Sequence, residues 1–396
     1  MDTRKGLQHT MKKNLEDICF DIEPNTMNYH ATSPEIVMTS SFYFDSFKSY
    51  SRASHDELNS FMYTRGSNPT TLQLEHKLAQ LEGGERCKVF ASGMGAISAT
   101  LFHLLSSNDH VVILNTIYST TLSFLKFLEQ YGVSYTLVNS LDAHAIERAI
   151  QKNTRVIYTE SPSTQKFEIV DLEVISKIAK NHHIISVIDN TWATPLFQRP
   201  LESGFDLVVA SCSKYIGGHS DIVCGALIGS KDLVEAIEKS GFVYLGATCS
   251  PFTSFLALRG LRTLPLRMKK HSENVVYLID ALKKDPRIQT IYHPYSQQHK
   301  LAKQTLEGYG SLLAITLVDK DIEKLECFVN ALNEYLLGVS WGGYESMVLP
   351  VYKGDNQDSI EKRGLDITHT RLFIGLKNPQ ILVDDVIQAL DCAYGK

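Results

Sequence analysis

An α/β fold, with a mostly parallel sheet sandwiched by helices, is predicted for this chain of 396 residues. Between about residues 86 and 237, short apolar runs rich in β-branched residues alternate with amphipathic segments. This alternation is typical of parallel strands joined by crossover helices. The chain is longer than one hydrophobic core usually fills, so a second lobe is expected. Sparser strand and helix signals beyond residue 285 predict a smaller C-terminal α/β domain.

The chain divides into three predicted parts. Residues 1–58 carry few periodic signals and several turn-forming residues, and we expect an irregular N-terminal arm that lies against another surface. Residues 59–250 are predicted to form the large domain. Residues 251–396 are predicted to form the C-terminal domain, which includes a long connecting helix.

The first helix of the large domain is predicted over residues 72–81, where leucines recur at helical spacing. Thr70 or Thr71 is expected to cap its start, and Gly83 and Gly84 to end it. A strand, a small-residue turn and an apolar helix follow. The turn places Ser92, Gly93 and Met94 at a helix amino terminus, where free backbone amides and the helix dipole favour a phosphate.

Later elements are predicted from the same signals. Strands are expected near residues 110–115, 134–139, 155–160, 184–188, 207–210, 222–228, 288, 312–317 and 371–375. Helices are expected from about residues 119, 142, 171, 232, 321 and 380, with a long one over 252–284 that bends at Pro265. Residues 339–350 show neither period, and residues 352–364 are expected to form an exposed loop.

Composition excludes several classes of function. A net charge of −5 and a pI near 6.3 give no electrostatic reason to expect binding to nucleic acid or to an anionic membrane surface. Seven scattered cysteines without a C-x-x-C pair indicate reduced thiols that mostly pack in the core. No apolar run reaches membrane-spanning length, and the histidines lack ligand spacing. A soluble cytoplasmic protein without a metal is expected.

The strongest functional signal lies between residues 184 and 224. Asp189 ends one buried strand, and Ser211, Ser213 and Lys214 follow the next, at the edge where open α/β sheets bind ligands. A buried lysine forms Schiff bases readily, a carboxylate can keep a pyridine nitrogen protonated, and hydroxyls can hold a phosphate. These groups match the needs of pyridoxal phosphate. On spacing alone an alternative stays open, in which Asp189 caps a turn and Lys214 extends into solvent.

Seven ordered motifs resemble the pyridoxal-phosphate enzymes of cysteine and methionine metabolism, the trans-sulfuration enzymes. They are YTRGSNPT, SGMGAI, DN at residues 189–190, SCSKYIGGHSD, LRGLRTLPLRM, SWGGYES and TRLFIGL. The resemblance covers residues from about 40 to the C-terminus. It implies the aminotransferase-like fold of type I, with pyridoxal 5′-phosphate bound in the large domain.

The resemblance also assigns roles. Lys214 matches the lysine that carries the cofactor and Asp189 the partner of its pyridine nitrogen, while Tyr118, which follows a predicted strand, matches a catalytic tyrosine that stacks on the ring. The phosphate cradle corresponds to Ser92, Gly93, Met94, Ser211 and Ser213. Arg371, assisted by Ser340, matches the group that binds the substrate α-carboxylate, with Trp341 beside it.

Tyr63 and Arg65 match residues that reach the phosphate of a neighbouring subunit, and the tyrosine also takes part in catalysis. A homo-oligomer is therefore implied, with pairs of dimers common in the family and the arm lying across the partner.

Within the family, the segments are most similar to bacterial cystathionine β-lyases. Val339 and Trp341 stand where many γ-acting relatives have a glutamate and a leucine-like residue. Thr164 replaces a frequent asparagine, and Ser119 and Thr120 differ from both β- and γ-acting enzymes. The expected reaction is β-elimination of L-cystathionine to homocysteine, pyruvate and ammonia, with cystine or cysteine as further substrates. Alternatives are methionine γ-lyase, cystathionine γ-synthase, O-acyl-homoserine sulfhydrylase and, more remotely, a non-catalytic binding protein.

Overall fold

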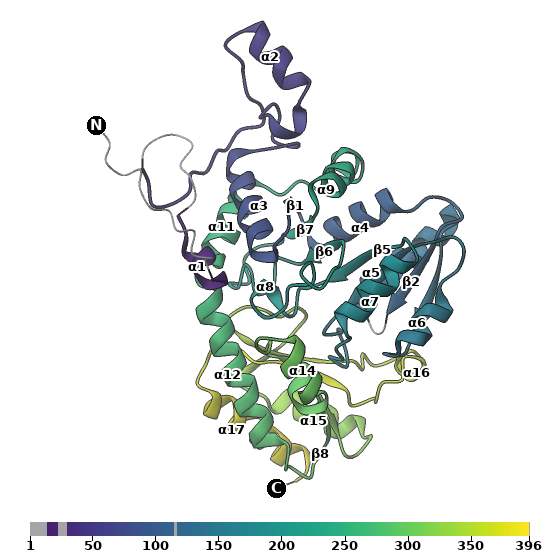
Figure 1. The fold of residues 1–396 in the computed structure, drawn as a ribbon. Coiled ribbons are helices and arrows are strands. Elements are labelled where there is room, and N and C mark those ends of the chain that lie inside the picture. The colour runs from purple at the N-terminus through teal and green to yellow at the C-terminus, as the bar shows by residue number, and fades with distance from the viewer. Residues whose placement is uncertain (1–13, 23–29, 115–116, 396) are drawn as a thin grey trace.

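The computed structural model describes residues 14–22, 30–114 and 117–395. A larger lobe holds one sheet and a smaller lobe holds a second, and helix α12 (Leu264–Leu282) runs from one to the other (Figure 1). Its first half contributes Leu264 and Met268 to the core of the large lobe, and its second half contributes Val275 and Leu278 to the core of the small lobe. One helix therefore belongs to both hydrophobic cores.

The large sheet has seven strands in the order β1-β7-β6-β5-β4-β2-β3. Their bounds are β1 Arg86–Phe90, β2 His110–Leu114, β3 Ser134–Val138, β4 Thr154–Glu160, β5 Ile185–Asp189, β6 Leu207–Ala210 and β7 Gly225–Gly229. The ladders from β3 through β2, β4 and β5 to β6 are parallel, whereas β7 runs antiparallel to both β1 and β6. The prediction of a largely parallel sheet is confirmed.

Helices cover both faces of this sheet because its strands are apolar on both sides. In β2, Val111 and Ile113 pack on one face and Val112 and Leu114 on the other, as the two-residue period of a strand requires. One face carries α4 (Gly93–Leu104), α5 (Ser119–Leu128) and α9 (Lys231–Ile237). The opposite face carries α3 (Pro69–Glu82), α6 (Ala143–Ala149), α7 (Leu172–Asn181) and α11 (Pro251–Leu261).

The small lobe has a five-stranded sheet in the order β10-β11-β12-β9-β8. Its strands are β8 Ile288–Tyr292, β9 Leu312–Leu317, β10 Tyr335–Leu337, β11 Ser346–Pro350 and β12 Thr370–Phe373. Helices α15 (Ile322–Ala331) and α17 (Pro379–Ala393) pack on one face together with α12. Leu313 and Ile315 of β9 point into this layer, whereas Leu312 and Ala314 belong to the core of the large lobe. The other face of the small sheet is therefore turned toward the large lobe.

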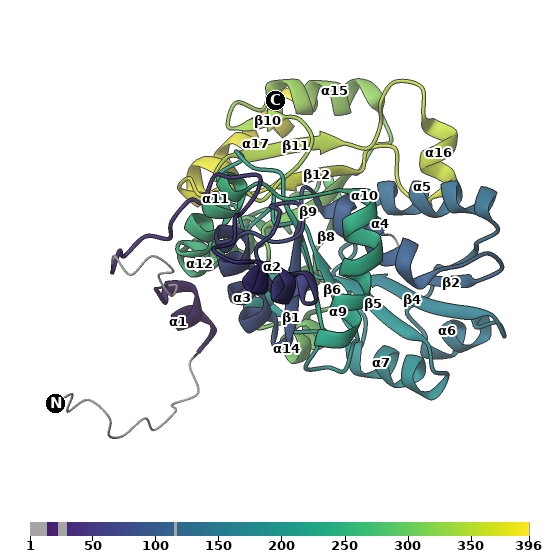
Figure 2. The same ribbon diagram turned by 90° about the horizontal axis from the view of Figure 1, so that it is seen from above.

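Short helices complete the chain. They are α1 Leu15–Phe20, α2 Phe47–Ser54, η1 Glu57–Asn59, η2 Glu129–Tyr131, α8 Thr194–Phe197, the π-helical η3 Glu238–Phe242, α10 Val243–Leu245, α13 Pro294–Gln297, α14 His299–Thr305 and α16 Gln357–Lys362. Figure 1 shows α2 at the end of an extended segment that projects away from both lobes, and Figure 2, seen from above, shows α2 in front of the large lobe near α3.

Five local predictions are wrong. The arm contains helices α1 and α2, and Asn68 rather than Thr70 or Thr71 caps α3, since its Oδ1 accepts the amide of Thr70. The helix over 252–284 is broken at residues 262–263, because Pro265 fits the first turn of a new helix better than the middle of one. Residues 339–350 include β11, and residues 352–364 include α16.

All seven cysteines are free, and five are buried. Cys392 is exposed, and Cys327 is partly exposed beside it, with 3.0 Å between the two sulfur atoms. Among the described residues, no group of three or more His, Cys, Asp or Glu side chains is arranged to hold a metal ion. The described helices also include none that is long and apolar enough to cross a membrane.

Thiol labelling of the native protein is expected to modify Cys327 and Cys392 first, because water reaches these two sulfur atoms. The five buried thiols should react only after denaturation. Peptide mapping by mass spectrometry after brief treatment with a maleimide measures the order, with Cys392→Ser as a control that removes one site. Rapid labelling of Cys212 or Cys224 in the native protein would contradict the burial of these two side chains.

Candidate active site

Lys214 lies in the turn after strand β6, and its side chain reaches the small lobe. Its amide donates to Ser211 O at 3.2 Å, and its carbonyl accepts from Gly218 N at 2.8 Å, so the backbone of the turn is fixed. Nζ donates to Ser340 Oγ at 2.5 Å and lies 5.7 Å from the centre of the Trp341 ring. These contacts bring together three predicted site residues, and they disagree with the alternative in which Lys214 extends into solvent.

The segment that carries Ser340 and Trp341 packs directly on the backbone of Lys214. Ser340 has a φ of 83°, a conformation that non-glycine residues adopt rarely. Gly342 has a φ of 97°, and a Cβ atom there would lie 2.7 Å from Lys214 Cα. Glycine is therefore required at this position for two reasons, its conformation and the close approach.

Asp189 ends strand β5 and is buried. Its Oδ1 accepts two hydrogen bonds from Thr191, from the amide at 2.9 Å and from the hydroxyl at 2.5 Å. The same hydroxyl accepts the amide of Ser211 at 2.8 Å, so Thr191 ties the ends of β5 and β6 together. Asp189 does form the local turn bond of the alternative interpretation. Both hydrogen bonds use Oδ1, and Oδ2 accepts no hydrogen bond from the described residues.

Glu160 is a site residue that the sequence prediction missed. It ends β4 directly beside Asp189 in the parallel ladder, and both carboxyl groups are buried. Oε2 accepts the amide of Tyr118 at 2.7 Å, and Oε1 accepts the hydroxyl of Thr164. Burial, and then the neighbouring Asp189, raise the pKa of Glu160. The signal was a carboxylate at the end of a buried strand, the same signal that identified Asp189.

Arg371 is brought to this cluster by the register of the small sheet. It lies opposite Ala314 of β9, and cross-strand partners share a face, so Arg371 is on the face turned toward the large lobe. Burial lowers the pKa of its guanidinium, and Glu160 is the nearby charge that opposes this effect. Nε is buried without a hydrogen-bond partner among the described residues.

Burial lowers the pKa of Lys214 to about 8, and the positive charge of Arg371 contributes in the same direction, against the opposing effect of Asp189. Burial also raises the pKa of Asp189. Near neutral pH a larger fraction of the Lys214 amine is therefore free of its proton than in an ordinary solvated lysine. A free amine is the form that attacks a carbonyl or accepts a proton.

The predicted phosphate cradle lies at the amino terminus of α4. Ser92 is the N-cap, and its hydroxyl accepts the amide of Gly95 at 3.0 Å. Gly93 faces Ser211, since a Cβ atom at Gly93 would lie 3.0 Å from Ser211 Cβ. A Cβ atom at Gly225 would lie 2.2 Å from Ser92 O, so glycine also allows β7 to approach this turn. Backbone amides and a serine thus gather where the sequence predicted an anion site.

Two other predicted cradle residues make contacts of their own. Ser213 Oγ accepts the amide of Cys224 at 2.9 Å and donates to its carbonyl at 3.2 Å. Met94 lies in the first turn of α4, where its sulfur is 4.0 Å from the Thr121 hydroxyl. Their contribution to phosphate binding stays a prediction.

Tyr63 and Arg65 lie outside this cluster. Tyr63 is 52% exposed, and its ring has Arg65 Cζ 5.8 Å from its centre. In the described part of the chain, no hydrogen bond or ion pair joins either residue to Lys214, Asp189 or Arg371. A surface hollow next to α1 also lies elsewhere, and none of the predicted site residues lines it.

Comparison with known proteins identifies the family to which the chain belongs. The sequence profile described as Cys/Met metabolism PLP-dependent enzyme matches residues 19–391. The chain belongs to this family. It is 35% identical over 373 residues to an L-methionine gamma-lyase of Fusobacterium nucleatum subsp. nucleatum, an alignment that covers 92% of this chain and 94% of the relative. It is 38% identical over 344 residues to the cystathionine beta-lyase MetC of Staphylococcus haemolyticus, which covers 85% and 86%.

The crystal structure of a cystathionine gamma synthase from Xanthomonas oryzae pv. oryzae in complex with aminoacrylate and cysteine has the same fold. The TM-score is 0.90 at 29% identity, with 97% of this chain and all of that chain covered. The family and type I fold predictions are confirmed, and pyridoxal phosphate is the cofactor of the family. The residues present suit it: an amine of lowered pKa, a buried carboxyl whose Oδ2 makes no hydrogen bond in the described part of the chain, and a helix amino terminus.

Acylation of Lys214 in the cofactor-free protein is expected to follow a titration with a midpoint near pH 8. Arg371→Met removes a positive charge that disfavours the ammonium, so the midpoint should rise. Asp189→Asn removes a negative charge that favours it, so the midpoint should fall. Pulse labelling with acetic anhydride across pH, read by peptide mass spectrometry, gives the midpoints. A midpoint that stays at the ordinary lysine value in all three proteins would contradict the burial of Lys214.

Proposed function

We propose that this protein is a carbon–sulfur lyase that catalyses β-elimination from L-cystathionine, with homocysteine, pyruvate and ammonia as products. The observation that carries the proposal is the contact of Ser340 and Trp341 with Lys214. It puts a carboxylate-binding segment and a large aromatic side chain next to the amine that would handle the Cα proton. The match to cystathionine beta-lyase MetC is consistent with this reaction.

The cofactor would be held by Lys214, by Asp189 at its pyridine nitrogen, and by the α4 turn at its phosphate, with Tyr118 against the ring. When bound, pyridoxal phosphate supplies an electron sink for the electron pair left at Cα. Thr191 orients Asp189, and Glu160 holds the backbone of Tyr118 through a 2.7 Å hydrogen bond. Both the carboxyl group that would meet the ring nitrogen and the tyrosine that would stack on the ring therefore have fixed positions.

The substrate α-carboxylate would bind Arg371. A guanidinium offers parallel donors that match a carboxylate, and the unpaired, buried Nε of Arg371 indicates capacity that the protein itself does not use. Ser340 Oγ lies 2.5 Å from Lys214 Nζ, close enough for the hydroxyl to serve both the amine and the bound carboxylate. With the carboxylate anchored, the Cα–H bond is presented to the lysine amine.

β-Elimination needs one base. Lys214, with a pKa of about 8, can take the Cα proton and return it to the leaving group or solvent. γ-Elimination requires a second deprotonation at Cβ. The exposed Val339 occupies the position at which many γ-acting relatives have a glutamate. Trp341, which packs edge-on against Tyr215 at 5.3 Å, occupies the position at which they have a leucine-like residue. Both features favour the simpler reaction.

A γ-lyase is the second candidate, because relatives named L-methionine gamma-lyase align over 92% of this chain. Thr120 weakens it, since methionine γ-lyases place a cysteine at this position. We also propose a homo-oligomer of paired dimers, in which the exposed Tyr63 and Arg65 serve the phosphate of a neighbouring subunit.

Product identification separates the candidates. With L-cystathionine, the purified protein is expected to release pyruvate and homocysteine, quantified by mass spectrometry against a Lys214→Ala control that should be inactive. Release of 2-oxobutyrate and cysteine, or methanethiol from methionine at a comparable rate, would assign the chain to γ-elimination. Product formation by the control at the original rate would remove Lys214 from the mechanism.

Arg371→Lys is expected to raise KM for cystathionine about tenfold or more while cofactor absorbance is retained, because a point charge replaces a bidentate donor. Steady-state kinetics and visible spectra of the same preparation measure the two effects. A loss of cofactor with unchanged KM would place Arg371 at the cofactor instead.

A further inference from the structure

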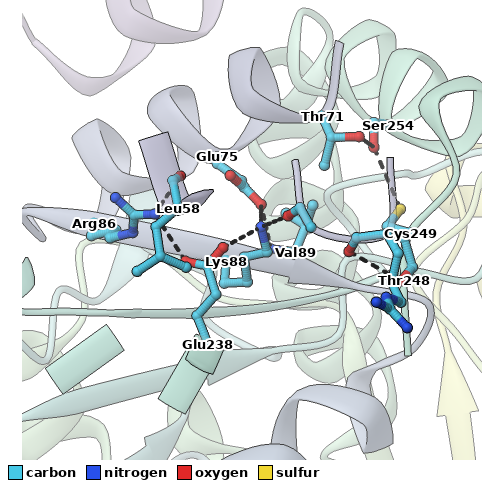
Figure 3. A network of polar contacts seen from close by, with 12 residues as sticks. Leu58, Thr71, Glu75, Arg86, Lys88, Val89, Glu238, Thr248, Cys249 and Ser254 are labelled. Atoms are coloured by element: carbon cyan, nitrogen blue, oxygen red, sulfur yellow. Dashed lines mark hydrogen bonds and ion pairs between the residues drawn. The ribbon is translucent and has the colours of Figure 1, made fainter. Parts of the chain in front are cut away.

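Lys88 is a buried lysine outside the active-site cluster (Figure 3). Its Nζ donates to Gly66 O at 2.7 Å and pairs with Glu238 at 2.8 Å and Glu75 at 3.4 Å. The ammonium also lies 4.6 Å from the ring centre of Phe242. Lys88 Nζ, which extends from β1, thus contacts α3, the loop before α3, and η3, which lies far away in the sequence.

Two basic side chains, Lys88 and Arg86, face three acidic side chains in this network, Glu75, Glu235 and Glu238. Arg86 pairs with Glu238 at 2.9 Å and with the more accessible Glu235 at 3.2 Å. Glu75 also accepts the amide of Val89 at 3.2 Å, on the open side of the edge strand β1. Burial alone would lower the pKa of Lys88, but Glu75 and Glu238 outweigh it and the pKa is raised. The amine therefore stays charged, and a buried charge forms strong hydrogen bonds.

Gly66 belongs to the loop that carries Tyr63 and Arg65. The loop backbone is fixed on its inner side: Gly66 N donates to Tyr63 O at 2.9 Å, and Thr248 Oγ1 donates to Arg65 O at 3.4 Å. The side chains of Tyr63 and Arg65 are exposed. The loop backbone is thus held by hydrogen bonds, while the side chains of Tyr63 and Arg65 stay accessible to a partner outside their own chain.

We propose that Lys88 is a positioning residue, whose bond to the Gly66 carbonyl holds Tyr63 and Arg65 in place for the cofactor phosphate of a second copy of this chain. The inference rests on the proposed oligomeric function. It differs from a purely structural role of Lys88, because the effect of losing Lys88 falls on the neighbouring subunit's site and not on its own.

The first measurement uses Lys88→Met combined with Glu238→Gln, which removes one charge of each sign. Arg86→Gln combined with Glu235→Gln is the matched control: it removes the same charges from the same network but no bond to Gly66. Loss of a charged hydrogen bond is expected to speed cofactor release about tenfold in the first protein, with faster hydrogen exchange over residues 60–68. The control should stay within about twofold of the original protein. Equal effects in both proteins would overturn the proposal.

Mixed oligomers give the decisive test. Subunits with Lys88→Met and Glu238→Gln are co-expressed with Lys214→Ala subunits under different affinity tags. In a mixed dimer, the site with an intact Lys214 receives its loop from a subunit with an intact Lys88. Its lysine-bound cofactor, followed by visible absorbance, is expected to be released at the original slow rate. Release as fast as in the unmixed Lys88 variant would show that Lys88 acts on its own site and would reject the proposal.

A reference pair keeps this result separate from the proposed function. Arg65→Ala subunits mixed with Lys214→Ala subunits test only whether the loop serves a neighbour. If the Arg65 pair does not restore slow release, the loop does not serve a neighbouring subunit. The proposed role of Lys88 is then rejected together with that arrangement. If the reference pair recovers while the Lys88 pair does not, the proposed function stands and only the positioning role is rejected. Thr248→Val, a milder change at Arg65 O, replaces the Lys88 variant if that variant does not fold.

Discussion

The constraint on which the site depends is the burial of opposite charges between two lobes. Lys214, Asp189 and Glu160 come from the large sheet, and Arg371 comes from the small one. Each group is largely removed from water, and the nearby opposite charges offset only part of the effect of burial on its pKa. A direct contact between the lobes at this cluster is the hydrogen bond from Lys214 Nζ to Ser340 Oγ. The lowered pKa of Lys214 follows from the same burial.

Sequence patterns predicted the parts of the site that depend on local order. Asp189 and Lys214 could be found because each follows a short apolar run, and the carboxyl ends of parallel strands share one edge. Arg371 could not be placed in this way. Its position depends on antiparallel pairing with Ala314, 57 residues earlier in the numbering, and a register of this kind leaves no local pattern. Only the family resemblance identified it.

Errors in the predicted fold concern mainly short elements. Helices α1 and α2 are six and eight residues long, too short for a periodic pattern to stand out. The mostly polar turns between residues 338 and 345 hid the strand β11 that follows them. Glu160 was missed although its position at the end of a buried strand matches that of Asp189, because the family resemblance assigned it no role. Long elements with a clear period were predicted well, and short elements were not.

The left-handed Gly342 limits how this enzyme can diversify. A Cβ atom there would lie 2.7 Å from the backbone of Lys214. Substitution of Gly342 would therefore displace Lys214, whichever substrate the enzyme is selected for. Val339 is 75% exposed, and Trp341 is only partly buried, so their side chains can change without moving the lysine. Libraries that randomise positions 339 and 341 and leave position 342 untouched would explore new sulfur substrates while they keep the cofactor chemistry intact.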